Sequence, residues 1–381
     1  MEKYKTVRLG DVCEIVMGTS PEGKTISQNS SAGIEFHQGK TCFGNLYLNE
    51  SGMFTNSPIR FADAGNVIMS VRAPVGDSNI TPRKIAIGRG LCTFNTKNNF
   101  EKLFLYYYLN SQIDFLRLQS TGSTFKAVNK DVISDLQIPL PPLQEQKQIA
   151  AILDKCTELI AKNKLMLEKY DTLIKSRFIE MFGDPVQNPM GWEKTELGNM
   201  CKEVRYGTSK PAIENGKYTY LRMNNITFEG ELDLANTKTI DISDEELPKC
   251  SVQKGDILFN RTNSIELCGK TCLYKLDETM VIAGYIIRVR VNEKLNPQYV
   301  STFFNTKSIK KLLKEMAKGA VNQANINAQE MQSIQIPVPP ITLQNEYDSF
   351  VQQIDKSKFA VQKSLEKAET LYKSLMQEYF G

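Results

Sequence analysis

Two long stretches of the chain repeat apolar residues every seven positions. Two adjacent rows in residues 143–183 are Leu153, Ile160, Leu167, Ile174 and Met181, and beside them Cys156, Asn163, Tyr170 and Arg177. Residues 341–381 repeat the pattern with Val351, Lys358, Leu365, Tyr372 and Tyr379, and beside them Ile354, Val361, Ala368 and Leu375. Such stripes predict two long amphipathic helices that pair as a coiled coil. The polar members Asn163, Arg177 and Lys358 favour a role in setting the register of this pair.

Both stretches also begin and end alike. Each follows a proline cluster, Ile138-Pro-Leu-Pro-Pro-Leu143 or Ile336-Pro-Val-Pro-Pro-Ile341, and each closes with Phe-Gly, at Gly183 and at Gly381. Proline is excluded from helix interiors and central strands, so each cluster predicts a rigid boundary between a globular part and a helix. A helix of roughly 40 residues is about 60 Å long, which is typical of a spacer.

The sequence before each proline cluster repeats as well. Gly18-Thr19-Ser20 matches Gly207-Thr208-Ser209, and the turn and buried strand that begin at Gly65 match those that begin at Gly255. A helix is expected at about 100–119 and at about 297–318, each ended by a glycine, Gly122 and Gly319.

This internal repeat predicts an α+β protein in which two domains, related by a pseudo-twofold axis, are joined by two long antiparallel coiled-coil helices. The expected boundaries are a first domain at 1–142, a helix at 143–183, a linker at 184–191, a second domain at 192–340 and a helix at 341–381.

The composition is that of a globular protein. Of the 381 residues, 41% are hydrophobic and 24% charged, and no apolar run approaches the roughly 18 residues of a membrane span. The N-terminal sequence has no apolar signal region, so we expect a cytoplasmic location. The eight cysteines are then expected to be reduced. Cys268 and Cys272 are spaced like metal ligands, but without a second pair or a histidine cluster we expect buried thiols rather than zinc.

Motifs of catalysis are missing from the sequence. The triplets Gly39-Lys40-Thr41 and Gly269-Lys270-Thr271 lack the earlier glycine of a P-loop, because Ile34 and Ser264 stand in its place. The cofactor and catalytic loops of a DNA methyltransferase are also missing. The single histidine, His37, is expected to be structural. The sequence therefore favours a binding protein that has no catalytic residues, cofactor or metal of its own.

The charge of the two expected domains is nearly balanced. Residues 1–142 carry 15 basic and 12 acidic side chains, and residues 192–340 carry 20 and 18. An autonomous nucleic-acid binder usually has a stronger basic excess. If the chain binds DNA, partner proteins are expected to supply much of the phosphate neutralisation.

The ordered set of motifs resembles the DNA-specificity subunits of type I restriction–modification enzymes, over essentially the whole chain. The resemblance rests on the two Ile-Pro-x-Pro-Pro junctions, the two Phe-Gly helix ends, Gln144-Glu145-Gln146 at the start of the first long helix, and three first-half segments beginning at Phe36, Gly65 and Ile87. In the second half Thr342-Leu-Gln-Asn-Glu346 stands where the first has Gln144-Glu-Gln, so that helix start is expected to be less typical.

The resemblance implies a division of labour. Each globular half would be a target-recognition domain that reads one part of a split sequence in double-stranded DNA. The helices would hold the two domains apart and dock the methyltransferase subunits, expected to be two, and through them the restriction and translocation subunits. Methyl transfer, translocation and cleavage would belong to those partners, and no membrane is involved.

Base contacts are expected from polar side chains on loops, because Arg and Lys pair with guanine and Asn and Gln with adenine. The candidate DNA-binding residues are Thr19, Ser20, Arg72, Ser123, Thr124, Lys126, Tyr206, Thr208, Lys210, Arg222, Asn224, Asn225, Arg261, Asn263, Asn322, Gln323 and Asn325. The same side chains could instead stabilise turns. The run Tyr106-Tyr107-Tyr108 is expected to pack in a helix rather than to stack on bases.

Two other functions remain open on sequence grounds. The chain could be a coiled-coil adaptor that binds proteins and reads no DNA, or an enzyme with an unfamiliar active site. An adaptor would show no sequence-selective DNA binding even with methyltransferase partners, whereas an enzyme would show turnover as an isolated chain.

Overall fold

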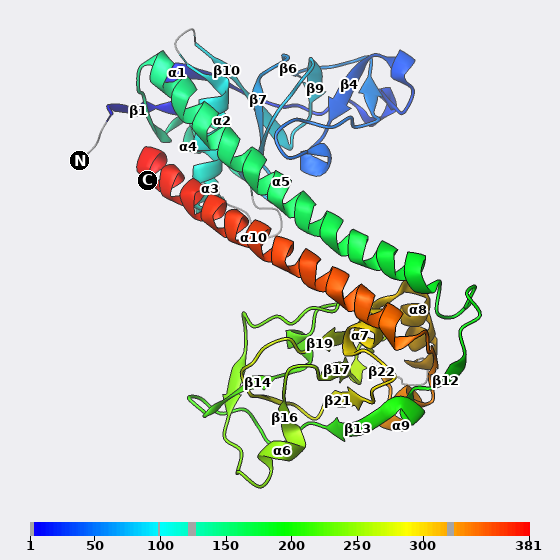
Figure 1. Ribbon diagram of the computed structural model, residues 1–381. Coiled ribbons are helices and arrows are strands. Elements are labelled where there is room, and N and C mark those ends of the chain that lie inside the picture. The colour runs from blue at the N-terminus through cyan, green and yellow to red at the C-terminus, as the bar shows by residue number, and fades with distance from the viewer. Residues whose placement is uncertain (1–3, 98–99, 121–126, 318–323) are drawn as a thin grey trace. The chain divides into compact units, whose positions relative to one another are not determined.

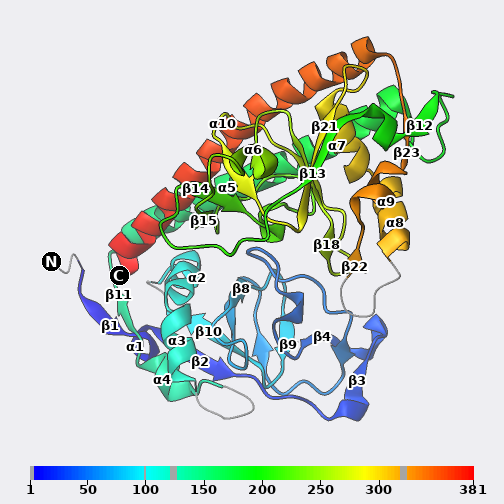
Figure 2. The same cartoon turned by 90° about the horizontal axis from the view of Figure 1, so that it is seen from below.

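The computed structural model describes residues 4–97, 100–120, 127–317 and 324–381 (Figure 1, Figure 2). It divides into two compact units, unit 1 with Met1–Lys164 and Gln362–Gly381, and unit 2 with Leu165–Val361. The long helices α5 (Leu143–Phe182) and α10 (Ile341–Phe380) each contribute a part to both units. The predicted 40-residue helices are thus confirmed.

Unit 1 is built on two main sheets. The first is antiparallel, in the order β2 (Cys13–Met17), β10 (Leu91–Thr96), β7 (Val67–Ser70) and β8 (Ser78–Ile80). The second has the order β3 (Ile26–Ser27), β5 (Phe54–Thr55), β4 (Ile34–His37), β9 (Ile85–Ile87) and β6 (Phe61–Ala62), with β4 and β9 parallel. The remaining elements are β1 (Thr6–Arg8), which pairs with β11 (Gln137–Pro139), and helices α1 (Leu9–Val12), α2 (Lys102–Ser111), α3 (Ile113–Gln119) and α4 (Lys130–Ser134).

Unit 2 repeats this plan. Its antiparallel sheet has the order β13 (Cys201–Tyr206), β21 (Ile286–Val291), β17 (Ile257–Asn260) and β19 (Thr271–Leu273). Its second sheet has the order β15 (Lys238–Ile240), β14 (Tyr218–Leu221), β20 (Met280–Ile282) and β16 (Ser251–Val252), with β14 and β20 parallel. The remaining elements are β12 (Lys194–Glu196) with β23 (Gln335–Pro337), β18 (Thr262–Asn263) with β22 (Ala324–Asn325), and helices α6 (Leu247–Cys250), α7 (Pro297–Asn305), α8 (Lys307–Met316) and α9 (Ala328–Gln332).

The predicted buried strands after Gly65 and Gly255 are confirmed. They are β7 and β17, and all their residues are buried. Both glycines have a positive φ, 78° and 95°, which suits the turn that precedes each strand. The mixture of sheets and helices in two repeated halves is the α+β fold that the sequence predicted.

The apolar rows of the long helices are confirmed as packing surfaces. Every member of the four rows is buried or half-buried. Asn163 and Lys358, which interrupt the rows, have polar partners. In unit 1 Asn163 Nδ2 donates to Ser364 Oγ (3.1 Å), and in unit 2 Lys358 Nζ lies 2.7 Å from Asp171 Oδ1. Arg177 lies over the ring of Phe350. Their role in fixing the register stays a hypothesis, now supported by pairs that join α5 to α10.

The Phe-Gly helix ends anchor the helices in the two cores. Phe182, at the end of α5, packs against Tyr299 and Tyr347 in unit 2. Phe380, at the end of α10, packs against Phe104 and Tyr108 in unit 1. Each long helix therefore starts on one unit and ends in the core of the other, which explains why the two helix ends share the same sequence.

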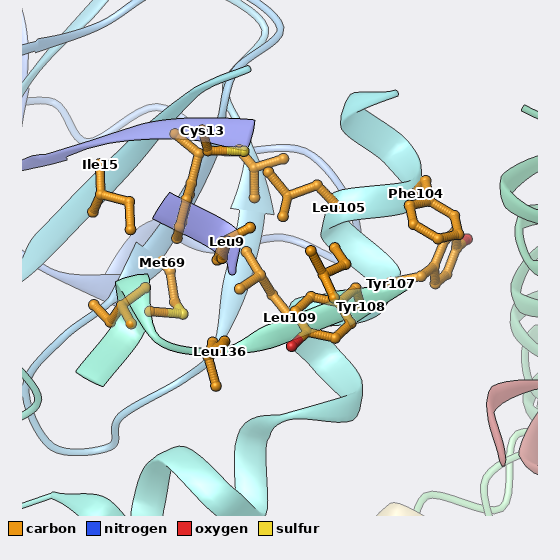
Figure 3. Close-up of a cluster of buried hydrophobic side chains, with 14 of the residues drawn as sticks. Leu9, Cys13, Ile15, Met69, Phe104, Leu105, Tyr107, Tyr108, Leu109 and Leu136 are labelled. Atoms are coloured by element: carbon orange, nitrogen blue, oxygen red, sulfur yellow. The ribbon is translucent and has the colours of Figure 1, made fainter. Parts of the chain in front are cut away.

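Two tyrosines of the run Tyr106–Tyr108 are buried in the core of unit 1. Figure 3 shows Tyr107 and Tyr108 among the buried side chains of α2. The Tyr108 hydroxyl donates to Gln137 O (2.9 Å) and the Tyr107 hydroxyl to Asp154 Oδ1 (3.2 Å). The expectation that this run packs within the fold is confirmed.

The cysteines fill the cores. Cys13 is buried in the first cluster, and Cys201 packs against the corresponding cluster of unit 2. Cys268 and Cys272 belong to two different hydrophobic clusters. Burial raises the pKa of the Cys272 thiol to about 12, so this group stays protonated.

Two sequence expectations need correction in detail. The helices expected at 100–119 and 297–318 are each two helices, interrupted at Gln112 and at Thr306. Thr306 is extended (φ −69°, ψ 151°), and its hydroxyl accepts the Ile309 amide and so caps α8. Gly122 and Gly319, expected to end the helices, lie outside the described residues.

The start of the second long helix is as regular as that of the first. Gln146 Nε2 donates to Pro141 O and its Oε1 accepts the Glu101 amide. Gln344 makes the same two bonds, to Pro339 O and from the Asn296 amide. The expectation of a less typical start was wrong, because the buried glutamine recurs at the fourth residue after each proline pair.

Candidate nucleic-acid interface

Three loops of unit 2, which follow β13, β14 and β17, meet the β20–β21 connection at one end of its sheets. The loop after β13 is tied to the β20–β21 connection, because Gly207 N donates to Ile286 O and Thr208 N to Ile282 O. A Cβ at Gly207 would lie 2.1 Å from Ile282 O, so only glycine allows this approach. Ala283 N donates to Leu221 O, which adds the loop after β14.

The loop after β17 joins the same place, since Arg261 N donates to Tyr285 O. The loops enclose an open groove of about 560 Å³. The groove is lined by Thr208, Ser209, Lys210, Pro211, Ala212, Tyr220, Arg222, Met223, Asn224, Arg261, Ala283, Gly284 and Tyr285. Five candidates that are far apart in the sequence, Thr208, Lys210, Arg222, Asn224 and Arg261, are thus brought together.

The side chains of the groove are held by specific contacts. The Tyr220 hydroxyl donates to Thr208 O and to Lys210 O (both 3.0 Å), and burial raises the pKa of Tyr220, so it remains a donor. Arg222 Nη2 donates to Asn236 O (3.0 Å). Lys210 pairs with Glu246, and this hydrogen bond lowers the pKa of Glu246. These contacts order both the loop backbone and the cations.

Tyr206, Arg261 and Asn325 form a connected group at the edge of the groove. The Arg261 guanidinium lies 4.9 Å from the centre of the Tyr206 ring, and its Nε donates to Asn325 Oδ1 (3.1 Å). The Tyr206 hydroxyl accepts the Ala328 amide (2.9 Å). All three residues were candidates from the sequence.

Two candidates of the second half do not fit a base contact in this structure. Asn225 is buried; its Oδ1 accepts the Arg222 amide and its Nδ2 donates to Asp233 O. Its amide therefore stabilises a turn, so we withdraw it as a base contact. Asn263 is half-buried in β18, where its Oδ1 accepts the Ser264 amide, and it is not part of the groove lining.

Unit 1 builds the same three-loop arrangement. Gly18 N donates to Leu91 O and Thr19 N to Ile87 O, as Gly207 and Thr208 do in unit 2. Ser20 Oγ donates to Gln38 Oε1 (2.8 Å) and accepts the Arg89 amide (3.2 Å). Thr19, Gln38 and Arg89 are exposed.

The strand pairing makes the two units comparable residue by residue. In unit 1 His37 pairs with Ile87, and in unit 2 Leu221 pairs with Ile282. The next residues, Gln38 and Arg222, are therefore equivalent. Likewise Val71 N donates to Gly90 O as Arg261 N does to Tyr285 O, so Val71 is equivalent to Arg261.

Arg72, the residue after Val71, is exposed, and its backbone forms an antiparallel β-bridge with Ala127. Its equivalent in unit 2 is Thr262, which pairs with Asn325. The loop that carries Arg72 is thus the counterpart of residues 260–264. The candidates Ser123, Thr124, Lys126, Asn322 and Gln323 lie outside the described residues.

An ionic network supports the end of β4 in unit 1. Glu35 accepts two hydrogen bonds from Arg83 and one from the Ser51 amide, and His37 Nε2 lies 2.9 Å from Glu35 Oε1. Burial raises the pKa of Glu35, but these bonds outweigh it and lower the pKa to about 2. Burial lowers the pKa of His37. The single histidine is thus part of the support beneath Gln38.

Sequence reasoning missed Gln38, Arg89 and Tyr285. All three are exposed at the three-loop ends, and Tyr285 is 51% exposed. The sequence signal existed only for Gln38, which follows the alternating apolar and polar residues of Ile34–His37. Its equivalence to Arg222 depends on the parallel pairing of β4 with β9 and of β14 with β20.

Comparison with known proteins agrees with the repeated fold. The family model for the type I restriction modification DNA specificity domain matches residues 1–169 and 189–369. The chain belongs to this family. The two matched segments contain the two sets of loops described above, so the three-loop ends are a repeated feature of a DNA specificity domain protein.

Individual relatives support the same assignment. A putative type I restriction enzyme MjaX specificity subunit from Methanocaldococcus jannaschii is 39% identical over 44% of this chain and 40% of the relative. The type I restriction enzyme EcoKI specificity subunit of Escherichia coli is 25% identical over 74% of this chain. The chain spans 64% of that relative, so it matches less than two thirds of either.

The fold is also that of a solved structure. The S subunit of a type I restriction-modification system from M. genitalium superposes with a TM-score of 0.62 at 17% identity, over 100% of this chain and 96% of that chain. In the part of the chain that the structure describes, no helix combines the length and apolar character needed to cross a membrane.

Proposed function

We propose that this chain is the DNA sequence-specificity subunit of a type I restriction–modification complex and that it reads a bipartite target in double-stranded DNA. The observation that carries the proposal is the three-loop end, which is built twice on the same scaffold with different polar side chains. Gln38 and Arg222 occupy equivalent positions but favour different bases. Two readers of unlike chemistry on one chain suit a target with two unlike halves.

The long helices suit the role of a spacer between the two readers. Each has 40 residues, which corresponds to about 60 Å. Both ends are fixed, by a buried glutamine at the start and by a phenylalanine in a core at the end. A rigid spacer would convert a fixed protein length into a fixed number of unread base pairs.

Exposed apolar side chains on the helices support the docking of methyltransferase subunits. Leu173 of α5 is 45% exposed and Leu371 of α10 is 52% exposed. They lie at the same distance from the starts of their helices, Leu143 and Ile341. Equivalent apolar positions in each half of the repeat would give two docking sites, hence two methyltransferase subunits, through which restriction subunits would join.

The number of methyltransferase subunits bound per chain tests the two proposed docking sites. Leu173→Glu and Leu371→Glu are each expected to reduce the methyltransferase subunits in the purified complex from two to one. The double variant should bind none, as measured by native mass spectrometry. Lys169→Glu changes an exposed polar residue of the same helix and should retain two. Two bound copies in the double variant would contradict this docking site.

The whole proposal is tested by mapping methylated adenines in a host with and without this gene. Deletion is expected to abolish methylation at one split motif. Purified complex should also bind duplexes with that motif more tightly than shuffled duplexes. If no motif disappears and no duplex is preferred even with methyltransferase subunits present, the chain is an adaptor rather than a specificity subunit.

A further inference from the structure

The guanidinium of Arg261 is held from two sides. Its central carbon lies over the Tyr206 ring, 4.9 Å from the ring centre, and its Nε donates to Asn325 Oδ1. Both supports are themselves fixed, because Tyr206 accepts the Ala328 amide and Asn325 Oδ1 also accepts Thr262 Oγ1 (2.9 Å). The cation–π contact and the Nε hydrogen bond restrain the guanidinium and leave the two terminal nitrogens as a fork.

The other two cations of the groove each have a terminal nitrogen bound to a protein acceptor. Lys210 is paired with Glu246, and Arg222 Nη2 is bound to Asn236 O. For the terminal nitrogens of Arg261, by contrast, the described residues supply no hydrogen-bond acceptor. Arg261 lines the groove, so this fork is available to a ligand there.

The described residues of unit 1 have no arginine at the equivalent position. The equivalent residue in unit 1 is Val71, which is 3% exposed and belongs to the core. A planar, preorganised fork matches the two acceptors O6 and N7 on the major-groove edge of guanine, whereas a cation that merely neutralises phosphate needs no fixed plane. The support by Tyr206 and Asn325 therefore favours base reading over a phosphate contact.

We infer that Arg261 reads a guanine in the DNA half-site recognised by the second half, and that Tyr206 and Asn325 are positioning residues for it. The inference rests on the proposed function and names the base that one side chain selects. A lysine at this position would retain the charge but lose both the Nε hydrogen bond to Asn325 and the fork.

The test uses the full chain in complex with its methyltransferase subunits. Binding is measured to a duplex with the methylation motif mapped for the wild-type complex, and each guanine is replaced in turn by 7-deazaguanine, which lacks the N7 acceptor. One replacement is expected to weaken wild-type binding about tenfold or more. Arg261→Ala should weaken binding to the unmodified duplex similarly and show no further loss with that replacement.

Two variants sharpen the result. Arg261→Lys should lose discrimination at the same guanine while it retains the salt dependence of binding. Lys254→Ala is the matched control, because Lys254 is an exposed cation at the opposite end of β17. It should leave the response to every replacement unchanged.

The positioning residues are tested by the same readout. Tyr206→Phe retains the ring and should retain the guanine response, whereas Tyr206→Ala and Asn325→Ala should reduce it several-fold while the first half-site is read normally. Loss of specificity at both half-sites would indicate misfolding, which circular dichroism of the same samples would detect.

Three outcomes would overturn the inference. In the first, the losses from Arg261→Ala and from 7-deazaguanine add at every guanine. In the second, the wild-type complex binds as tightly after every replacement as before. In the third, Arg261→Ala weakens binding to all duplexes equally and lowers the slope of log affinity against log salt concentration by about one, as loss of a phosphate contact would. These outcomes leave the proposed function intact, which fails only if the wild-type complex cannot distinguish its motif from a shuffled duplex.

Discussion

The two three-loop ends share a backbone and differ in side chains. Gly18 and Gly207 both bring a loop against a neighbouring carbonyl, at distances that no side chain would allow. At the tips of the strands, unit 1 has the exposed Gln38 where unit 2 has the half-buried Arg222, and the buried Val71 where unit 2 has the half-buried Arg261. The difference shows that the scaffold positions are constrained by close packing, whereas the tips can change without disturbing it.

The supports beneath the tips differ too. Gln38 follows His37, which belongs to the Glu35–Arg83 network, whereas Arg222 follows Leu221, which is buried in a hydrophobic cluster. The helix pair shows the same contrast, with the neutral Asn163–Ser364 pair in unit 1 and the charged Lys358–Asp171–Glu231 group in unit 2. One fold thus uses two kinds of polar chemistry at related places.

The largest expected effect comes from breaking the shared scaffold. Gly207→Ala places a Cβ 2.1 Å from Ile282 O, and Gly18→Ala places one 2.2 Å from Gly88 O. Each is expected to destabilise its unit by about 3 kcal/mol, measured by urea denaturation. Gly284→Ala is the control, because its nearest contact would be an ordinary 3.5 Å to Thr208 O. Equal stability of all three variants would contradict the close-packed scaffold.

A smaller effect is expected from the charged group of unit 2. The Lys358 side chain is 18% exposed; burial lowers its pKa, but the Glu231 and Asp171 carboxylates raise it more. Lys358→Met would leave two carboxylates without their cation and should cost about 2 kcal/mol by urea denaturation. Since the folded pKa is raised, this stabilisation is present below the unfolded pKa and is lost as pH rises above it.

The matching change in unit 1 provides the contrast. Asn163→Leu removes a neutral pair and should change stability by less than about 1 kcal/mol. If Asn163→Leu proved more destabilising than Lys358→Met, the charged group would not be the stronger of the two links between the helices.

The tips should change specificity rather than stability. Arg222→Gln introduces the residue of unit 1 into unit 2 and is expected to alter the preferred base in one half-site by about 1–2 kcal/mol. Its stability should stay within about 0.5 kcal/mol of wild type. Methylation mapping would show one changed half-site beside one unchanged half-site. A change in both halves would argue against two independent readers.

The smallest effect is expected from lowering the pH, which should weaken the Glu35–Arg83 network beneath Gln38 more than the hydrophobic cluster beneath Arg222. The folded pKa of Glu35 is about 2, so its stabilisation is present above the unfolded pKa of about 4.3 and is lost as pH falls toward 2. Because Arg83 is partly exposed, the loss should be about 1 kcal/mol. Hydrogen exchange should show β4 opening more readily at pH 3 than at pH 5, with less change in β14. Glu35→Gln should remove this difference; an identical response of both strands would contradict it.

The sequence by itself determined the repeat and the pair of long helices. Heptad spacing and proline clusters act through local geometry, so residues 143–183 and 341–381 could be recognised as helices without knowing what they contact. It also predicted as candidates Arg222 and Arg261, which line the groove, and Tyr206, which contacts Arg261. It could not separate Asn225, which holds a turn, from Asn224, which lines the groove.

Tertiary structure alone decided which of these residues act together. The equivalence of Gln38 with Arg222 follows from parallel strand pairing between segments far apart in the chain. The Arg261 fork depends on Tyr206 and Asn325, which approach it from distant strands. Local periodicity has no information on such long-range pairing, because register between separate strands is fixed only when the whole sheet closes.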